Sequence, residues 1–189
     1  MTEKFFSRDY NINLNESEKT FAKTEIEAMI ESFVNEHFND LKIKKPSLVL
    51  NNRLSSTNGS YNPNINRITL SGKMIKAVLV SNNYEHLKKV LSHELCHWYL
   101  FKKKGNYRDG EEEFESLLKK VDSASSGATN KRLQFVPPLG QFGFYKVNKC
   151  KKCGYSIYLN TVVGKNRVHK DCGGHFEFDS IVLLMGEDD

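Results

Sequence analysis

The chain has 189 residues, enough for one main hydrophobic core with a small appended module and too few for two full-sized domains. Its 28 Lys and Arg residues against 23 Asp and Glu residues describe a mildly basic protein. The longest apolar runs, 77–80 and 181–185, cannot span a bilayer, and the first ten residues carry no signal-peptide core. We therefore expect a cytoplasmic protein without membrane association, whose four cysteines are thiols or metal ligands rather than disulfides.

The first half of the chain predicts one long helix followed by two strands. Apolar residues recur at helical spacing over residues 15–38, so an amphipathic helix is expected there. Residues 47–54 predict a strand and residues 66–70 a second one, and Asn58–Gly59 between them is typical of a hairpin turn. The apolar positions of the helix are Phe21, Ile26, Met29, Ile30, Phe33, Val34 and Phe38.

Two further helices are predicted before a linker. Residues 83–103 carry one apolar stripe, and Gly105 marks its end. A shorter helix is expected over residues 110–121, and residues 122–130 have linker composition. The side chains expected to face inward are Leu87, Leu91, Leu95 and Trp98 in the longer helix, and Phe114, Leu117 and Leu118 in the shorter one.

The stretch S-H-E-L-C-H-W-Y-L, residues 92–100, places an H-E-x-x-H motif in the middle of the longer helix. Its four-residue spacing puts His93 and His97 one turn apart on the same face, where both imidazoles can reach one zinc ion. Glu94 is then beside the metal rather than on it. There it can accept a proton from an activated water and pass it to a leaving amine, the general-base role of metalloproteases. Cys96 is expected to fill the core.

The third zinc ligand is less obvious, because no histidine follows His97 until His169. Zinc in a catalytic site takes three protein ligands and keeps an open fourth position. The stretch R-D-G-E-E-E-F-E offers carboxylates that a short helix folding back could deliver. An alternative role for Asp109 is the N-cap of that helix, since D-x-x-E is a helix-start pattern. The candidates are Asp109, Glu111, Glu112 and Glu113.

The C-terminal part repeats one short motif. C-K-K-C-G (150–154) and H-K-D-C-G (169–173) both have the form ligand-x-x-ligand-Gly, in which the glycine can turn the chain beneath a metal ion. The repeat predicts a structural zinc site and favours His169 over His175, although His175 remains an alternative. Residues 155–160 and 175–184 are the expected flanking strands. The predicted ligands are Cys150, Cys153, His169 and Cys172.

Between Thr129 and Lys170 the chain has no acidic residue. Such a one-signed run attracts phosphate or an acidic partner, or is simply a solvated face. Interleaved aromatic side chains can stack on unpaired bases or serve as ordinary packing. The predicted nucleic-acid contacts are Lys149, Lys151, Lys152, Lys165 and Arg167, and the aromatic residues are Phe142, Phe144, Tyr145, Tyr155 and Tyr158.

Residues 92–114, together with residues 61–71 and the C-terminal cysteines, resemble the SprT-like family, relatives of the Spartan DNA–protein crosslink proteases. The resemblance implies a small zincin-like metalloprotease domain and a C-terminal zinc ribbon. Family members typically carry a third histidine shortly before the Phe of the following helix, and Asp109 occupies that place here. We therefore prefer Asp109 as the third ligand, with Glu113 as second choice.

Together these patterns predict an α+β protein with a zincin-like domain at 1–125, a linker at 126–145 and a zinc ribbon at 146–189, holding one catalytic and one structural zinc ion. The expected function is a zinc-dependent metalloprotease acting on proteins near DNA or RNA. The strand at 67–70 is expected at the cleft edge, paired with an extended substrate or in ordinary sheet structure. The alternatives are a nucleic-acid-binding protein that lost catalysis with the third histidine, and a hydrolase of another amide.

Overall fold

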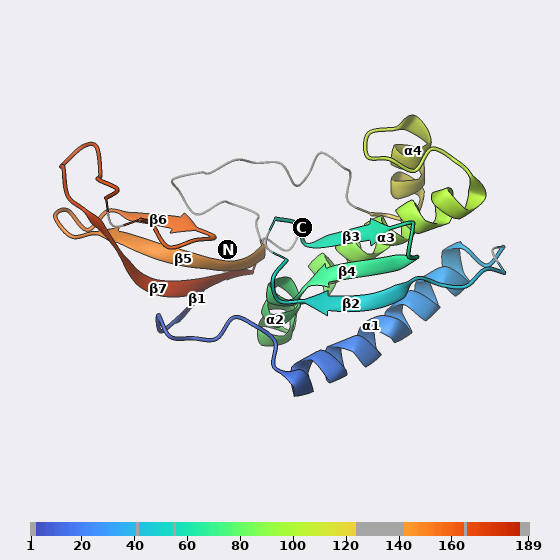
Figure 1. Cartoon of the computed structure of the whole chain (residues 1–189), viewed down its shortest axis with the longest axis horizontal. Coiled ribbons are helices and arrows are strands. Elements are labelled where there is room, and N and C mark those ends of the chain that lie inside the picture. Colours follow the sequence, from blue (N-terminus) through green and yellow to red (C-terminus); the bar gives the residue numbers. More distant parts are fainter. Residues whose placement is uncertain (1–2, 41, 55, 124–141, 165, 186–189) are drawn as a thin grey trace. The chain divides into compact units, whose positions relative to one another are not determined.

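The computed structural model describes residues 3–40, 42–54, 56–123, 142–164 and 166–185 (Figure 1). The chain forms two compact units: Asn13–Asn130, the first unit, and Met1–Ile12 with Lys131–Asp189, the second unit. The division differs from the predicted boundaries, because the N-terminal residues belong with the C-terminal half. Most of the predicted linker, 126–145, lies outside the described residues, and its last four residues already belong to a strand.

The first unit begins with the predicted helix, α1 (Glu16–His37). Its start is fixed by a capping box, in which Asn15 Oδ1 accepts from the Glu18 N–H at 2.8 Å and Glu18 accepts from the Asn15 N–H at 3.0 Å. The prediction of this helix is confirmed, but Phe21 is 55% exposed. The buried face of the helix consists instead of Ala22, Ile26, Ile30 and Val34.

Three strands form the sheet of the first unit: β2 (Ser47–Asn51), β3 (Gly59–Asn62) and β4 (Arg67–Ser71), in the order β2-β4-β3. β4 pairs in parallel with β2 and antiparallel with β3. Of the two positions considered for this strand, the cleft edge and the ordinary sheet interior, the second is correct, since both sides of β4 are paired. The predicted hairpin turn at Asn58–Gly59 is also wrong. The chain reverses after β3 instead, where Asn66 adopts a left-handed conformation with φ 47°.

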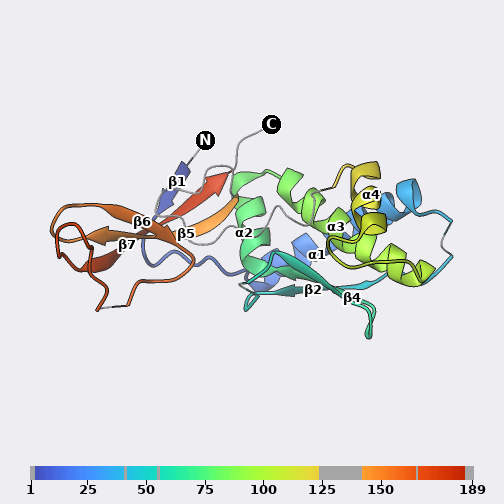
Figure 2. The ribbon, with the colours of Figure 1, turned by 90° about the horizontal axis from the view of Figure 1, so that it is seen from above.

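Helices cover one face of this sheet. The unpredicted α2 (Gly72–Ser81) follows β4 directly, and α3 (Glu85–Lys103) carries the H-E-x-x-H motif. Figure 2 shows α1, α2 and α3 on the same side of the sheet, toward which β4 buries Ile68 and Leu70. The predicted stripe of α3 is buried as expected. None of the described helices is both long and apolar enough to cross a lipid bilayer.

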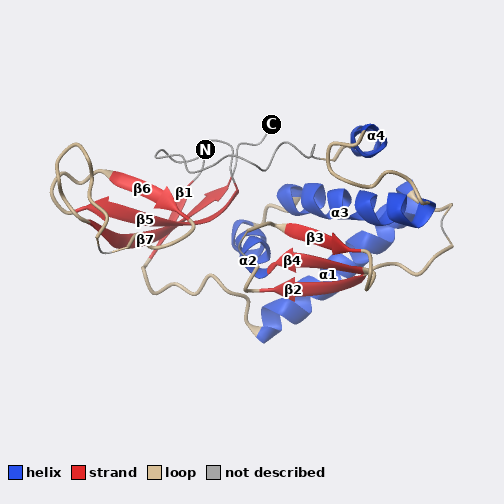
Figure 3. Cartoon of the chain, turned by 45° about the horizontal axis from the view of Figure 1, so that its top comes forward, coloured by secondary structure: helices blue, strands red, loops and turns tan. Residues whose placement is uncertain are grey.

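The second unit is a four-stranded antiparallel sheet, shown with the other elements in Figure 3. Its strands are β1 (Glu3–Phe6), β5 (Phe142–Cys150), β6 (Ser156–Leu159) and β7 (Phe176–Met185), in the order β1-β7-β5-β6. The strands expected at 155–160 and 175–184 are confirmed as β6 and β7, while β1 and β5 were not predicted. Phe6 stacks on Tyr10 with ring centroids 4.2 Å apart and meets Phe144 edge-on at 5.8 Å. The described part of the chain thus has an α+β fold, as predicted.

Candidate functional site

Three donor atoms meet above α3 and form what we call the helix site. His93 Nε2 lies 3.2 Å from His97 Nε2 and 3.1 Å from Asp109 Oδ1, and His97 Nε2 lies 3.5 Å from the same carboxylate oxygen. The two histidines come from successive turns of α3. Asp109 comes from the loop that leads to α4 (Glu112–Lys120). The structure therefore brings together the three residues that the sequence placed around one ion.

The spacing of these atoms fits a single bound cation. Nitrogen and oxygen atoms held at about 2.0–2.1 Å by a tetrahedral ion lie roughly 3.3 Å apart from one another. The three observed separations, 3.1, 3.2 and 3.5 Å, bracket that value. The donor set of two imidazoles and one carboxylate is also one that zinc accepts while keeping a fourth position open.

The His97 ring is oriented by contacts on both sides. Its Nδ1–H donates to the carbonyl oxygen of Tyr107, which leaves the lone pair of Nε2 directed at the helix site. The ring stacks on Phe114 of α4 with centroids 4.2 Å apart, and His93 meets the same Phe114 edge-on at 5.1 Å. Burial lowers the pKa of His97, and this favours the neutral imidazole that a metal requires.

Glu94 lies beside these donors in a buried position and is only 7% exposed. Burial, reinforced by the negative charge of Asp109, raises the pKa of the Glu94 carboxyl to about 8, although a hydrogen bond from the Tyr61 backbone N–H acts to lower it. Gly59 lets β3 approach this side chain closely, because a Cβ there would lie 3.1 Å from Glu94 Cγ. A divalent cation at the helix site would favour the ionised carboxylate.

The N-cap alternative for Asp109 does not hold. The N-cap of α4 is Glu111, whose side chain makes no capping hydrogen bond. Asp109 instead directs its carboxylate at both histidines, although the side chain is 64% exposed. The second-choice ligand, Glu113, is occupied elsewhere, since it accepts a hydrogen bond from the Asn106 N–H at 2.8 Å.

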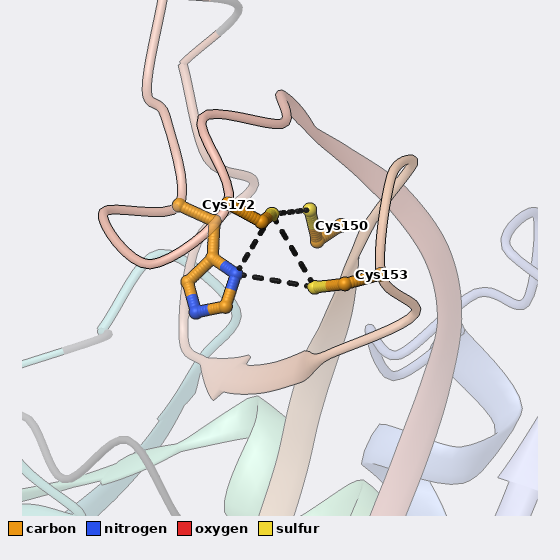
Figure 4. Close-up of side chains that lie close together, drawn as sticks. Cys150, Cys153 and Cys172 are labelled. Atoms are coloured by element: carbon orange, nitrogen blue, oxygen red, sulfur yellow. Dashed lines mark hydrogen bonds between the residues drawn. The ribbon is translucent and has the colours of Figure 1, made fainter.

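A second cluster, the knuckle site, gathers the four predicted residues of the second unit. Figure 4 shows the sulfur atoms of Cys150, Cys153 and Cys172 turned toward one another, with Cys172 Sγ 3.5 Å from each of the other two. His169 Nδ1 lies 3.2 Å from Cys153 Sγ and 3.3 Å from Cys172 Sγ. All four donor atoms lie within 4.8 Å of one another.

The two segments 150–154 and 169–173, the knuckles, each form the same kind of backbone turn, as their matching sequences suggested. Gly154 N–H donates to the Cys150 carbonyl at 2.9 Å, and Gly173 N–H donates to the His169 carbonyl at 2.8 Å. Both glycines have positive φ, 77° and 68°, a conformation that favours glycine. His175 forms an isolated bridge with Val168 and has no place in the cluster.

The knuckle site also fits a metal ion. Sulfurs bound to tetrahedral zinc at about 2.3 Å lie roughly 3.7 Å apart, close to the 3.5 Å that separates Cys172 Sγ from each of the other two sulfurs. Burial acts to raise the pKa of Cys150, but N–H groups of Cys153 and Lys152 and the neighbouring thiols bring it down to about 6. That environment favours the thiolate, which is the form that binds metal. His169 Nε2 lies 3.4 Å from Asp171 Oδ2, a contact that orients the ring.

Two of the predicted nucleic-acid contacts have partners within the chain. Lys151 pairs with Glu177 at 2.9 Å, and Lys152 donates to the Cys172 carbonyl at 2.7 Å. Lys149 and Arg167 are exposed, and Lys165 lies outside the described residues. Of the five interleaved aromatic side chains, Tyr155 is 41% exposed and stacks on His169 at 4.6 Å. The other four, Phe142, Phe144, Tyr145 and Tyr158, are partly buried.

Sequence reasoning missed three contributors to the helix site: the Tyr107 carbonyl, the Phe114 ring and the Tyr61 N–H. Phe114 was expected to face inward, but its contact with both histidines depends on how α4 packs on α3. The other two are backbone groups. No side-chain pattern could have identified them, because every residue except proline carries the same backbone groups.

The role of Asp109 can be tested by substitution. Asp109→Ala should weaken metal binding at the helix site by at least the ~10- to 100-fold typical of losing an outer-shell partner. Asp109→His should preserve or tighten binding, because imidazole is an equally suitable ligand there. Chelator competition on purified protein measures both, with Arg108→Ala as the neighbouring control. Unchanged affinity in Asp109→Ala would exclude the ligand role.

Comparison with known proteins identifies the family of this chain. Residues 26–134, more than half of the chain, match the SprT-like family, and they include the whole helix site. Relatives named Protein SprT-like include those of Streptococcus sanguinis, 29% identical over 57% of this chain and 65% of that protein, and Streptococcus suis, 30% identical over 56% and 65%. Another, from Oceanobacillus iheyensis, is 32% identical over 49% of this chain and 55% of its own length. The match spans less than two thirds of each of these relatives. Because the family match covers more than half of this chain, the chain belongs to the SprT-like family.

Proposed function

We propose that this protein is a zinc-dependent metalloprotease that acts on proteins near nucleic acid. The observation that carries the proposal is the convergence of His93, His97 and Asp109 within 3.5 Å of one another, next to the buried Glu94. Two neutral imidazoles and a carboxylate hold a divalent ion, and a carboxylate beside it is placed to move a proton. Membership of the SprT-like family supports the same interpretation.

Each residue then has a distinct part in the hydrolysis of a peptide bond. When bound, zinc supplies the Lewis acidity that polarises the scissile carbonyl and makes a water molecule more acidic. Glu94 accepts a proton from the attacking water as the new C–O bond forms, and it donates that proton to the leaving amine as the C–N bond breaks. The Tyr61 N–H holds the Glu94 carboxylate in position through this exchange.

We expect an extended substrate peptide to pair with β3 rather than with β4. β3 is an edge strand of the three-stranded sheet, and Tyr61 contacts Glu94 from it. An extended peptide can add to such an edge through main-chain hydrogen bonds. A peptide docked there would pass beside Glu94, which is where the scissile bond must lie.

In this proposal the knuckle site is the structural zinc site of a zinc ribbon, and the ribbon carries the nucleic-acid contacts. Four protein donors close the site, as in structural zinc sites. We define the basic surface as Lys149, Arg167 and Lys170, three exposed basic side chains of this region. Such a surface would bind phosphates, with an affinity that falls as salt rises.

The proposal is tested by measuring casein cleavage and metal content on the same sample, with and without DNA. Cleavage should require metal, and DNA should accelerate it by concentrating the protein substrate. The double variant Lys149→Glu and Lys170→Glu should lose the DNA stimulation and keep activity on a short peptide. Lys151 and Lys152 are left intact, because Lys152 supports the Cys172 knuckle and Lys151 pairs with Glu177.

The outcomes separate the candidate functions. DNA binding without cleavage would favour a nucleic-acid-binding protein whose metal sites are structural. The presence of Asp109 in place of the third histidine would be consistent with that function. Cleavage of small amides but not of protein would favour an amidase. Equal DNA affinity in the double variant and the unmodified protein would show that the basic surface is only solvated.

A further inference from the structure

The loop between α3 and α4, residues 105–110, supplies two separate contacts to the helix site. Its Tyr107 carbonyl accepts the His97 Nδ1–H, and its Asp109 carboxylate meets both histidines. One contact orients a ligand and the other is a ligand. The position of this loop therefore determines whether the three donor atoms converge.

The same loop also donates backbone N–H groups to carboxylates at the start of the helix that follows. The Asn106 N–H donates to Glu113 at 2.8 Å, the Arg108 N–H donates to Glu111 at 3.0 Å, and the Gly110 N–H donates to Glu115 at 3.2 Å. These bonded amides belong to every second residue of the loop, and Tyr107 and Asp109 lie between them. Consecutive residues thus alternate between binding α4 and facing the histidines.

Gly105 leaves room for one of these contacts. A Cβ at this position would lie 2.7 Å from Glu113 Oε1, much closer than a side chain allows. The Gly105 N–H also donates to the Leu100 carbonyl and so closes the end of α3. Because glycine has no side chain, the Glu113 carboxylate can lie close to the start of the loop.

We propose that Glu111, Glu113 and Glu115 are positioning residues, a carboxylate brace that sets the metal affinity of the helix site without binding the metal. The inference rests on the proposed function, because it assumes that His93, His97 and Asp109 bind an ion. Each brace residue accepts a hydrogen bond from a backbone N–H of the loop. Without these hydrogen bonds the loop would be free to move and carry Asp109 away from the histidines. Outer-shell partners of this kind typically change metal affinity by about 10- to 100-fold.

The structure offers a matched control in Glu112, an exposed residue of the same helical turn that does not bond to the described loop. Glu113→Ala should lower the zinc affinity of the helix site by ~10-fold or more. Glu112→Ala removes the same charge and should change the affinity much less. Glu113→Gln should restore most of it, because the amide oxygen can still accept the Asn106 N–H.

Affinity is measured on the full chain by titration with zinc against a chromophoric chelator. The knuckle site serves as the internal reference in every variant, since its ligands come from other elements. An unchanged knuckle affinity and an unchanged melting temperature show that the fold is intact. Gly105→Ala gives an independent perturbation: it should displace the Glu113 carboxylate and lower helix-site affinity to a similar extent at little cost in stability.

Equal losses in Glu113→Ala and Glu112→Ala would overturn the brace, since charge alone would then explain both. So would full zinc affinity in Glu113→Ala. A failure of the proposed function has a different signature, in which the unmodified protein binds no zinc at the helix site or binds it without cleaving protein. Hydrogen exchange of the Asn106 amide, which is bonded to Glu113, reports this part of the brace directly, and it should be faster in Glu113→Ala even without metal.

Discussion

Glu94→Gln should abolish peptide-bond hydrolysis while metal stays bound at the helix site. The Gln amide has nearly the same shape and can still accept the Tyr61 N–H, but it cannot take a proton from water. General-base catalysis typically contributes about 10²- to 10⁴-fold, so cleavage should fall by at least ~100-fold. The His93 and His97 ligand atoms are untouched, which is why metal content should be unchanged.

The measurement compares initial rates of casein cleavage with zinc content in the same preparations. Glu85→Gln is a suitable control, because Glu85 lies in the first turn of the same helix and pairs with Lys88 on the surface. That variant should retain full activity. Appreciable cleavage by Glu94→Gln would remove Glu94 from the mechanism, and loss of zinc together with activity would make it a structural residue.

The second large effect is expected at the knuckle site. Freshly purified protein should contain two zinc ions per chain, and Cys150→Ser should leave one and unfold the second unit around the knuckles. Cys150 is buried against Ile157, Leu159 and Phe176, a small cluster of the kind that depends on its metal. Structural zinc in small finger domains contributes about 10–16 kcal/mol of apparent binding energy at pH 7.

The two sites should also differ in how easily they lose metal. The knuckle site is closed by four protein donors, whereas the helix site has three and keeps a position for water, so a chelator should strip the helix site first. Cys96→Ala is the control, because this thiol is buried in α3, belongs to neither cluster and has a pKa that burial raises to about 12. Two ions in Cys150→Ser, or fewer than two in the unmodified protein, would contradict this prediction.

The sequence by itself determined the elements that local chemistry specifies. The apolar spacing of α1 and α3 requires only neighbours along the helix, so both helices were predicted within two residues of their ends. The positive φ of Gly154 and Gly173 was expected from the motif, because a tight turn beneath two ligands requires it. His93 and His97 share a helix face for the same local reason, and Glu94 lies beside that face.

The tertiary structure decided everything that depends on contacts distant in sequence. β3 and not β4 is the edge strand beside Glu94, because β4 pairs with β2 on its other side. The run without acidic residues is not free of acids in space, because β7 places Glu177 opposite Lys149. β1 joined the second unit because its partner is β7, nearly the whole chain away.

The third donor of the helix site shows the same limit most clearly. The residues alone offered Asp109, Glu111, Glu112 and Glu113 as candidate carboxylates within five positions, and only the resemblance to the SprT-like family favoured Asp109. The fold separates them by their partners: the Asp109 carboxylate meets the histidines, while Glu111 and Glu113 accept backbone N–H groups of the loop. Which carboxylate meets an ion depends on how α4 packs against α3, and that packing is set by buried side chains such as Phe114 and Leu118, not by the carboxylates themselves.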